Sequence, residues 1–148
     1  MNGEEKVQKE LIEKFGFLQD RVRITRPRRI LADVEAQNFR PVFDYAIDKL
    51  GFSILCAITG LDETEMFGLI YHIAKVDGTI LSLKTCAPKT DPAIKTVTDR
   101  FPAADIYERE IMDLLGIKVE GLAAGNRYPL ADDWPKDEFP LRKDWKSK

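Results

Sequence analysis

The densest group of chemically capable residues in the chain is Glu108, Arg109, Glu110 and Asp113. Neighbouring carboxylates can share a proton in acid–base catalysis, whereas a carboxylate beside an arginine forms an ion pair. On a helix, Glu108 and Glu110 point about 200° apart, so they cannot share one proton site. Arg109 and Asp113 are four residues apart, on the face opposite the apolar stripe, and within pairing reach. The spacing therefore predicts a charged helix face and no catalytic carboxylate pair.

Two further places could carry chemistry, and each also has a structural interpretation. His72 is the only histidine and lies in the middle of an expected strand, where a hydrogen-bonded structural role is more common than catalysis. Asp132 and Asp133 are adjacent acids in a proline-flanked loop, which is typical of a turn or a helix start. No phosphate-binding glycine loop, nucleophile elbow or zinc-protease motif is present. A stand-alone small enzyme built on these three residues remains an alternative hypothesis.

The metal-binding capacity of the sequence is small. Cys56 and Cys86 belong to no Cys-x-x-Cys motif. Iron–sulfur clusters usually require four thiolates, and structural zinc requires four nitrogen or sulfur ligands. We therefore expect no metal, no cofactor and no catalytic residue on this chain.

The composition excludes some classes of function. The net charge is −2 over 148 residues, which argues against a dedicated nucleic-acid or anionic-membrane binder. No apolar run approaches the roughly 20 residues of a membrane span, and the polar N-terminus resembles no signal peptide, so we expect a soluble cytoplasmic chain. One basic cluster is either a solvated strand edge or a site for an acidic protein partner: Arg21, Arg23, Arg26, Arg28 and Arg29.

The elements that must position these residues follow from periodicity and from turn signals. Asn38 is a plausible helix cap, Gly51 a helix end, and Asp77-Gly78 a hairpin signal. The order α-β-β-α-β-β-β-α-α predicts an α+β two-layer sandwich, with a mixed or antiparallel sheet and helices on one face. The expected helices are 4–15, 39–50, 92–98 and 102–116, and the expected strands are 21–25, 29–34, 53–59, 66–75 and 79–85.

The segment after Gly116 differs from the rest of the chain. It has no helical or strand period, yet it holds three prolines and several aromatic residues, including Trp134 and Trp145. Such a composition fits disorder poorly. The segment either wraps its own domain or lies over a partner as an arm. We therefore divide the chain into an α+β domain, 1–116, and an extended C-terminal arm, 117–148.

Several motifs in one order resemble the thirty-kilodalton subunit family of respiratory complex I, which has relatives in energy-converting [NiFe] hydrogenases. The likeness spans about residues 50–145. The motifs are Tyr71-His72-Ile73, Val97-Thr98-Asp99, Pro102 to Glu110 with Asp113 to Gly116, Asp132 to Pro135, and Pro140 to Trp145.

The resemblance implies a non-catalytic assembly subunit in the hydrophilic arm of an ion-translocating membrane oxidoreductase. The chain would lie on the cytoplasmic face and clasp the large subunit, beside a small iron–sulfur subunit and membrane-arm subunits, with [NiFe] and iron–sulfur centres on those partners. No contact with nucleic acid and no membrane span of its own are implied. The partner interface would consist of Glu108, Arg109, Glu110, Asp113, Arg127, Asp132, Asp133, Trp134, Leu141, Arg142, Lys143 and Trp145.

One departure from the respiratory pattern bears on the branch of the family. Leu122-Ala123 stands where the respiratory form has His-Pro, and Gly125 to Leu130 replaces a basic, leucine-rich stretch. This departure favours an energy-converting [NiFe] hydrogenase or a related ferredoxin-linked complex. The alternatives are the thirty-kilodalton subunit of an NADH– or ferredoxin–quinone oxidoreductase and, from another class, a soluble interaction domain.

Overall fold

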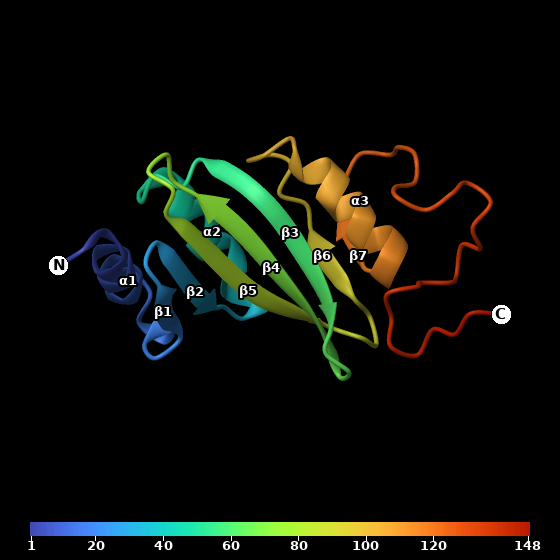
Figure 1. Ribbon diagram of the computed structural model, residues 1–148, viewed down its shortest axis with the longest axis horizontal. Coiled ribbons are helices and arrows are strands. Elements are labelled where there is room, and N and C mark those ends of the chain that lie inside the picture. Colours follow the sequence, from blue (N-terminus) through green and yellow to red (C-terminus); the bar gives the residue numbers. More distant parts are fainter. The chain divides into compact units, whose positions relative to one another are not determined.

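The computed structural model describes residues 1–148 as a mixed α+β fold with three α-helices (Figure 1). The chain divides into two compact units, Met1–Ala57 with Ile70–Cys86 and Ile58–Leu69 with Ala87–Lys148. The elements are α1 (Gly3–Lys14), a 3-10 turn (Gly16–Leu18), β1 (Val22–Arg26), β2 (Arg29–Asp33), α2 (Ala36–Asp48), β3 (Ile54–Asp62), β4 (Met66–Ala74), β5 (Ile80–Pro88), β6 (Ala93–Lys95), α3 (Ala104–Leu115) and β7 (Lys118–Glu120).

A five-stranded mixed sheet has the order β1-β2-β5-β4-β3. β1 and β2 form an antiparallel hairpin, whereas β2 pairs with β5 in parallel, with Arg29 opposite Ile80. The other pairs are neighbours along the chain, so short turns connect them. The expected strands at 21–25, 29–34, 53–59, 66–75 and 79–85 are confirmed, with shifts of a few residues at their ends.

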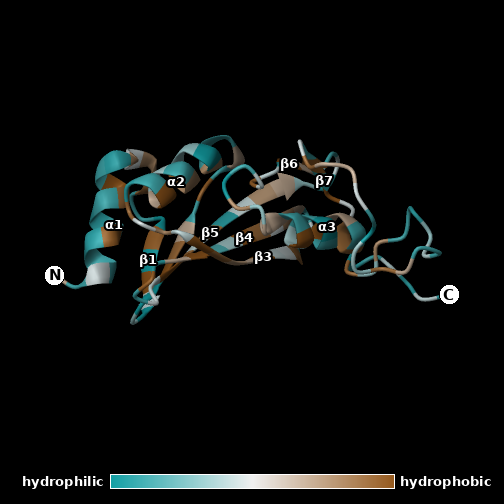
Figure 2. Cartoon of the chain, turned by 90° about the horizontal axis from the view of Figure 1, so that it is seen from above, coloured by the Kyte–Doolittle hydropathy of each residue, from teal (hydrophilic) through white to brown (hydrophobic).

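In the first unit, helices cover the sheet through an aromatic core. Phe39 and Phe43 of α2 stack on each other and contact Tyr71 of β4, with ring centroids 4.5 and 5.8 Å from that of Tyr71. α1 and α2 carry hydrophobic residues on one side and hydrophilic residues on the other (Figure 2). The helical period of the sequence thus selects the buried side of each helix.

In the second unit, α3 packs closely against β3. A Cβ on Gly60 would lie 2.6 Å from Leu115 Cδ1, so only glycine allows this approach. α3 ends at Gly116, whose φ of 73° is left-handed, as the expected glycine cap requires. Beside α3, β6 and β7 form a separate two-stranded parallel sheet.

Two local predictions are wrong. Residues 92–98 do not form a helix, because Ala93–Lys95 pairs in parallel with Lys118–Glu120. That non-local pairing overrides the Asp91-Pro92 signal for a helix start. Asn38 does not cap α2, which already begins at Ala36 after Glu35.

Candidate functional site

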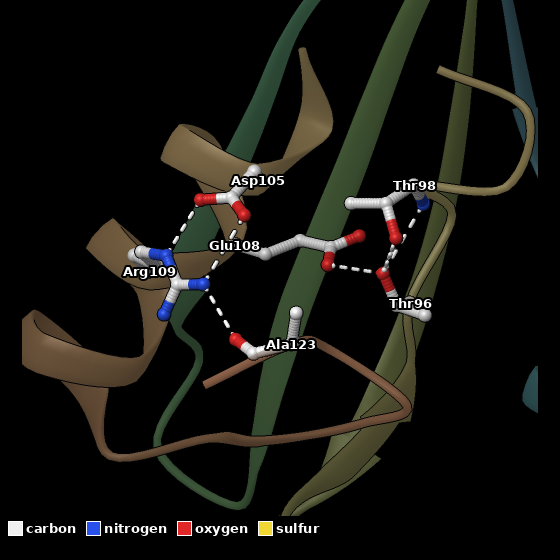
Figure 3. Close-up of polar contacts among 6 residues, drawn as sticks. All are labelled: Thr96, Thr98, Asp105, Glu108, Arg109 and Ala123. Carbon is white, nitrogen blue, oxygen red and sulfur yellow. Dashed lines mark hydrogen bonds and ion pairs between the residues drawn. The ribbon is translucent and has the colours of Figure 1, made fainter. Parts of the chain in front are cut away.

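Arg109 is held within its own unit by α3 and by the segment that follows β7 (Figure 3). Its Nε and Nη2 donate to the carboxylate of Asp105, at 2.5 and 3.1 Å, and Nη2 also donates to the Ala123 carbonyl oxygen at 2.6 Å. The hydrogen bond that Arg109 donates to Asp105 raises the pKa of Arg109. Gly125 lies so close that a Cβ there would be 2.9 Å from Arg109 Cζ. Arg109 therefore fixes residues 123–125 against α3.

Arg109 does not pair with Asp113, although the helical spacing puts the two residues within reach of each other. Asp113 lies one turn further along α3 and accepts hydrogen bonds from Arg127 Nε and the Leu130 backbone N–H, both at 3.0 Å. Arg127 also donates to the Trp134 carbonyl oxygen at 2.6 Å. Because Asp105 and Asp113 are equally spaced from Arg109, the C-terminal segment decides which carboxylate the arginine binds.

Glu108 lies in the interior of the second unit. Its carboxylate accepts a hydrogen bond from Thr96 Oγ1 at 2.7 Å (Figure 3). It also accepts one from the Val97 backbone N–H at 2.8 Å. The side chain is fully buried, and burial raises the pKa of Glu108. Its role within the chain is to join α3 to residues 96–97. Glu110, by contrast, is half-buried.

Replacing Glu108 by glutamine is expected to change how stability depends on pH. The folded-state pKa lies above the unfolded value, so the native chain has this contribution in full below about pH 4.5 and loses it as pH rises through the folded pKa. Glutamine keeps an acceptor for Val97 and carries no charge to bury. Urea unfolding at pH 4 and pH 7 should show the variant gaining stability relative to the native chain as pH rises. A constant difference would contradict the burial argument.

A second set of contacts holds residues 139–143. Arg142 donates through Nε to the Leu115 carbonyl oxygen at 2.6 Å, and its guanidinium lies over the rings of Phe67 and Phe139, at 5.1 and 4.6 Å. The Leu141 backbone N–H donates to the Leu114 carbonyl oxygen at 3.0 Å. The last carbonyls of α3 are therefore bonded by the C-terminal segment instead of by water.

Asp62 anchors the same segment and was not among the predicted site residues. It accepts the Lys143 backbone N–H at 2.8 Å and pairs with Lys89 Nζ at 2.6 Å, with its side chain 2% exposed. The bond from Lys89 lowers the pKa of Asp62 to about 2. The sequence signal here was only that of a turn, because Asp62 stands in Gly60-Leu61-Asp62-Glu63.

The two tryptophans of the C-terminal segment pack together, with ring centroids 5.9 Å apart. Trp134 Nε1 donates to the Glu138 carbonyl oxygen at 2.8 Å, whereas Trp145 Nε1 is buried without an acceptor. Tyr128 and Leu141 point outward and are 42% and 54% exposed. Within the predicted arm, 117–148, residues 118–120 form β7, and we keep the name arm for residues 121–145. The arm forms an ordered layer with apolar side chains on its surface.

The residues of the alternative enzymatic hypothesis are not assembled into a metal site. Asp132 and Asp133 are exposed, and His72 Nδ1 bonds to Ser82 Oγ at 2.8 Å. Burial lowers the pKa of His72. The structure contains no group of three or more His, Cys, Asp or Glu side chains placed to hold a metal ion. None of its helices is both long enough and apolar enough to cross a membrane.

A family model described as "Respiratory-chain NADH dehydrogenase, 30 Kd subunit" matches residues 32–148, and this range contains α3 and the whole arm. The chain belongs to this family. The matched range therefore contains the residues that join α3 to the arm.

Relatives in this thirty-kilodalton family come from several membrane complexes. A subunit of the F(420)H(2) dehydrogenase of Methanosarcina mazei is 33% identical over 89% of this chain and 85% of that protein. "Formate hydrogenlyase subunit 5" of Escherichia coli is 35% identical over 72% of this chain but only 20% of its own length. A chain in the structure of the membrane-bound sulfane sulfur reductase, an archaeal respiratory membrane complex, has a TM-score of 0.84 at 29% identity, covering 96% of this chain and 85% of that one.

Proposed function

We propose that this chain is a non-catalytic assembly subunit in the hydrophilic arm of an ion-translocating membrane oxidoreductase of the complex-I type. It clasps the large catalytic subunit through the arm and lies on the cytoplasmic face, beside a small iron–sulfur subunit and the membrane-arm subunits. The [NiFe] and iron–sulfur centres belong to those partners. Family membership and the relatives in dehydrogenase, hydrogenlyase and sulfur-reductase complexes support the assembly role.

The observation that carries the docking proposal is the construction of the arm. Arg109 and Asp113 of α3 bond the arm through their charged groups, and Arg142 of the arm bonds the Leu115 carbonyl oxygen of α3. The fixed segment nevertheless exposes Tyr128 and Leu141. A segment that is ordered before it binds loses little conformational entropy on association, and exposed aromatic and aliphatic side chains supply contact energy. The arm is thus preorganised for a protein partner.

The branch of the family is proposed to be an energy-converting [NiFe] hydrogenase or a related ferredoxin-linked complex. Leu122-Ala123, which departs from the respiratory pattern, lies where Arg109 bonds the Ala123 carbonyl oxygen. This local chemistry depends on the backbone and needs no histidine. The hydrogenlyase relative supports this branch, and the description of the family model keeps the quinone branch as the alternative.

Replacing Leu141 by aspartate is expected to weaken retention of the chain in its complex without unfolding it. Leu141 is exposed, so the isolated chain should unfold at an unchanged temperature. At an interface, a buried charge in place of an anchor residue costs about 2 kcal/mol or more, which is over tenfold in affinity. The measurement is the amount of large subunit that co-purifies with the tagged chain from gently solubilised membranes.

Ile54→Asp is the matched control, because Ile54 is an aliphatic residue that is 45% exposed, lies in the first unit and is not part of the arm. It should co-purify like the native chain. Equal retention of Leu141→Asp and the native chain would remove Leu141 from the interface and count against docking through the arm.

A further inference from the structure

Two turns of the first unit lie at the same end of the sheet. One joins β1 to β2 and holds Arg26 and Arg28, and the other joins β4 to β5 and holds Asp77 and Gly78. They lie together because β2 and β5 pair in parallel, and the Ile80 backbone N–H donates to the Arg28 carbonyl oxygen at 3.0 Å. We call residues 26–29 and 75–79 the two-turn surface.

Specific contacts hold the two-turn surface in place. Arg28 has a left-handed φ of 59°, which is uncommon for a non-glycine residue, and its backbone N–H donates to the carboxylate of Glu4 in α1. Arg29 Nη1 donates to the carbonyl oxygens of Arg28 at 2.8 Å and Gly78 at 3.2 Å. These hydrogen bonds therefore hold the backbone that carries Arg28 and Arg29 in one conformation.

Positive charge is in excess at this surface, although the chain as a whole has a net charge of −2. Arg21, just before β1, and Arg23, within β1, each have a carboxylate 3.8 Å away, in Glu35 and Asp33 respectively. Arg26 at the turn is exposed and makes no ion pair within the chain. Four cations face two carboxylates here: Arg26, Arg28, Arg29 and Lys75 against Glu4 and Asp77.

We propose that the two-turn surface binds a short acidic polypeptide segment of a partner protein. Arginine forks match carboxylates in a bidentate geometry, and the exposed Val76 adds one apolar contact beside them. A surplus of two charges is too small for stable binding to an anionic membrane, which takes a larger basic cluster or an inserted apolar face. The two-turn surface belongs to the first unit and the arm to the second, so the two proposed sites share no residue.

The test is binding of the full chain to a fluorescein-labelled oligoglutamate peptide, measured by fluorescence anisotropy at low and at near-physiological salt. The variant Arg26→Gln/Arg28→Gln keeps the backbone N–H that Glu4 accepts. It should bind about fivefold more weakly, since each exposed ion pair contributes little alone. The control Lys136→Gln/Lys146→Gln removes the same charge from exposed positions of the arm and of the residues just after it, and should bind like the native chain. The single variant Arg26→Gln should also bind the peptide more weakly than the native chain. Because Arg26 is exposed and makes no ion pair within the chain, this variant tests the site even if the double variant misfolds.

The site is supported if only the arginine variants bind the peptide more weakly than the native chain, and if this difference becomes smaller at higher salt. Equal binding by the arginine and lysine variants, or no binding of the peptide by the native chain, overturns it. Binding to vesicles of phosphatidylcholine and phosphatidylglycerol in preference to the peptide also overturns it, in favour of a lipid surface. None of these outcomes depends on assembly with a large subunit.

Discussion

Replacing Asp113 by alanine is expected to release the middle of the arm and to destabilise the chain by about 2–3 kcal/mol. Asp113 is buried, and both its oxygens bind the arm, one to Arg127 and the other to the Leu130 backbone. Its loss strands the guanidinium of Arg127, although that group is partly exposed and can turn to water, so the lower end of the range is expected. The measurement is urea unfolding, with limited proteolysis of the arm as a second readout.

Asp133→Ala is the control for this prediction, because it removes an exposed arm carboxylate. It should change stability by less than about 0.5 kcal/mol. The double variant Asp113→Ala/Arg127→Ala should be less destabilised than the sum of the two single variants, because the ion pair is counted in both. Additive effects would mean that the pair contributes nothing.

Replacing Arg142 by alanine is expected to destabilise the chain by about 2–3 kcal/mol. The variant loses the hydrogen bond to the Leu115 carbonyl oxygen at the end of α3 and the guanidinium between Phe67 and Phe139. The last turn of α3 then has one carbonyl fewer satisfied. The measurements are the midpoint of urea unfolding and the rate of proteolytic cleavage within residues 141–148.

Lys143→Ala separates the effect of the Arg142 side chain from that of charge in the arm. The Lys143 side chain is exposed, whereas its backbone N–H still bonds Asp62 in the variant. Its stability should stay close to that of the native chain. If Lys143→Ala is as destabilised as Arg142→Ala, the positive charge of the arm, and not the specific contacts of the Arg142 guanidinium, would hold residues 139–143 against α3.

Local signals predicted most of the fold. The apolar stripe from Phe39 to Leu50 predicted α2, and Gly116 predicted the end of α3. Asp77-Gly78 predicted the hairpin of β4 and β5. Each of these signals depends on residues that are close in sequence. The failure at 92–98 has a different origin. β6 exists only because β7 lies beside it more than twenty residues later, and a local pattern cannot reveal such a pairing.

The sequence singled out Arg109, Asp113 and Arg127, but it did not single out Asp105 and Asp62 or predict which side chains pair. Arg109 has carboxylates four residues before and four residues after it, and helical spacing alone does not choose between them. The choice follows from Arg127, which binds Asp113. Glu108 was expected at a partner interface on family resemblance, yet it is buried against Thr96 and Val97, whose donors the sequence could not place.

Photo-crosslinking from the arm in native membranes tests whether the arm docks on the large subunit. A photoreactive benzoylphenylalanine in place of Tyr128, which is exposed on the arm, reacts only with what lies within contact distance. Crosslinks to a large subunit of a complex-I-like oxidoreductase, identified by mass spectrometry, are the predicted result. Crosslinks confined to the chain itself, with the same probe at Ile54 giving the same pattern, would contradict docking through the arm.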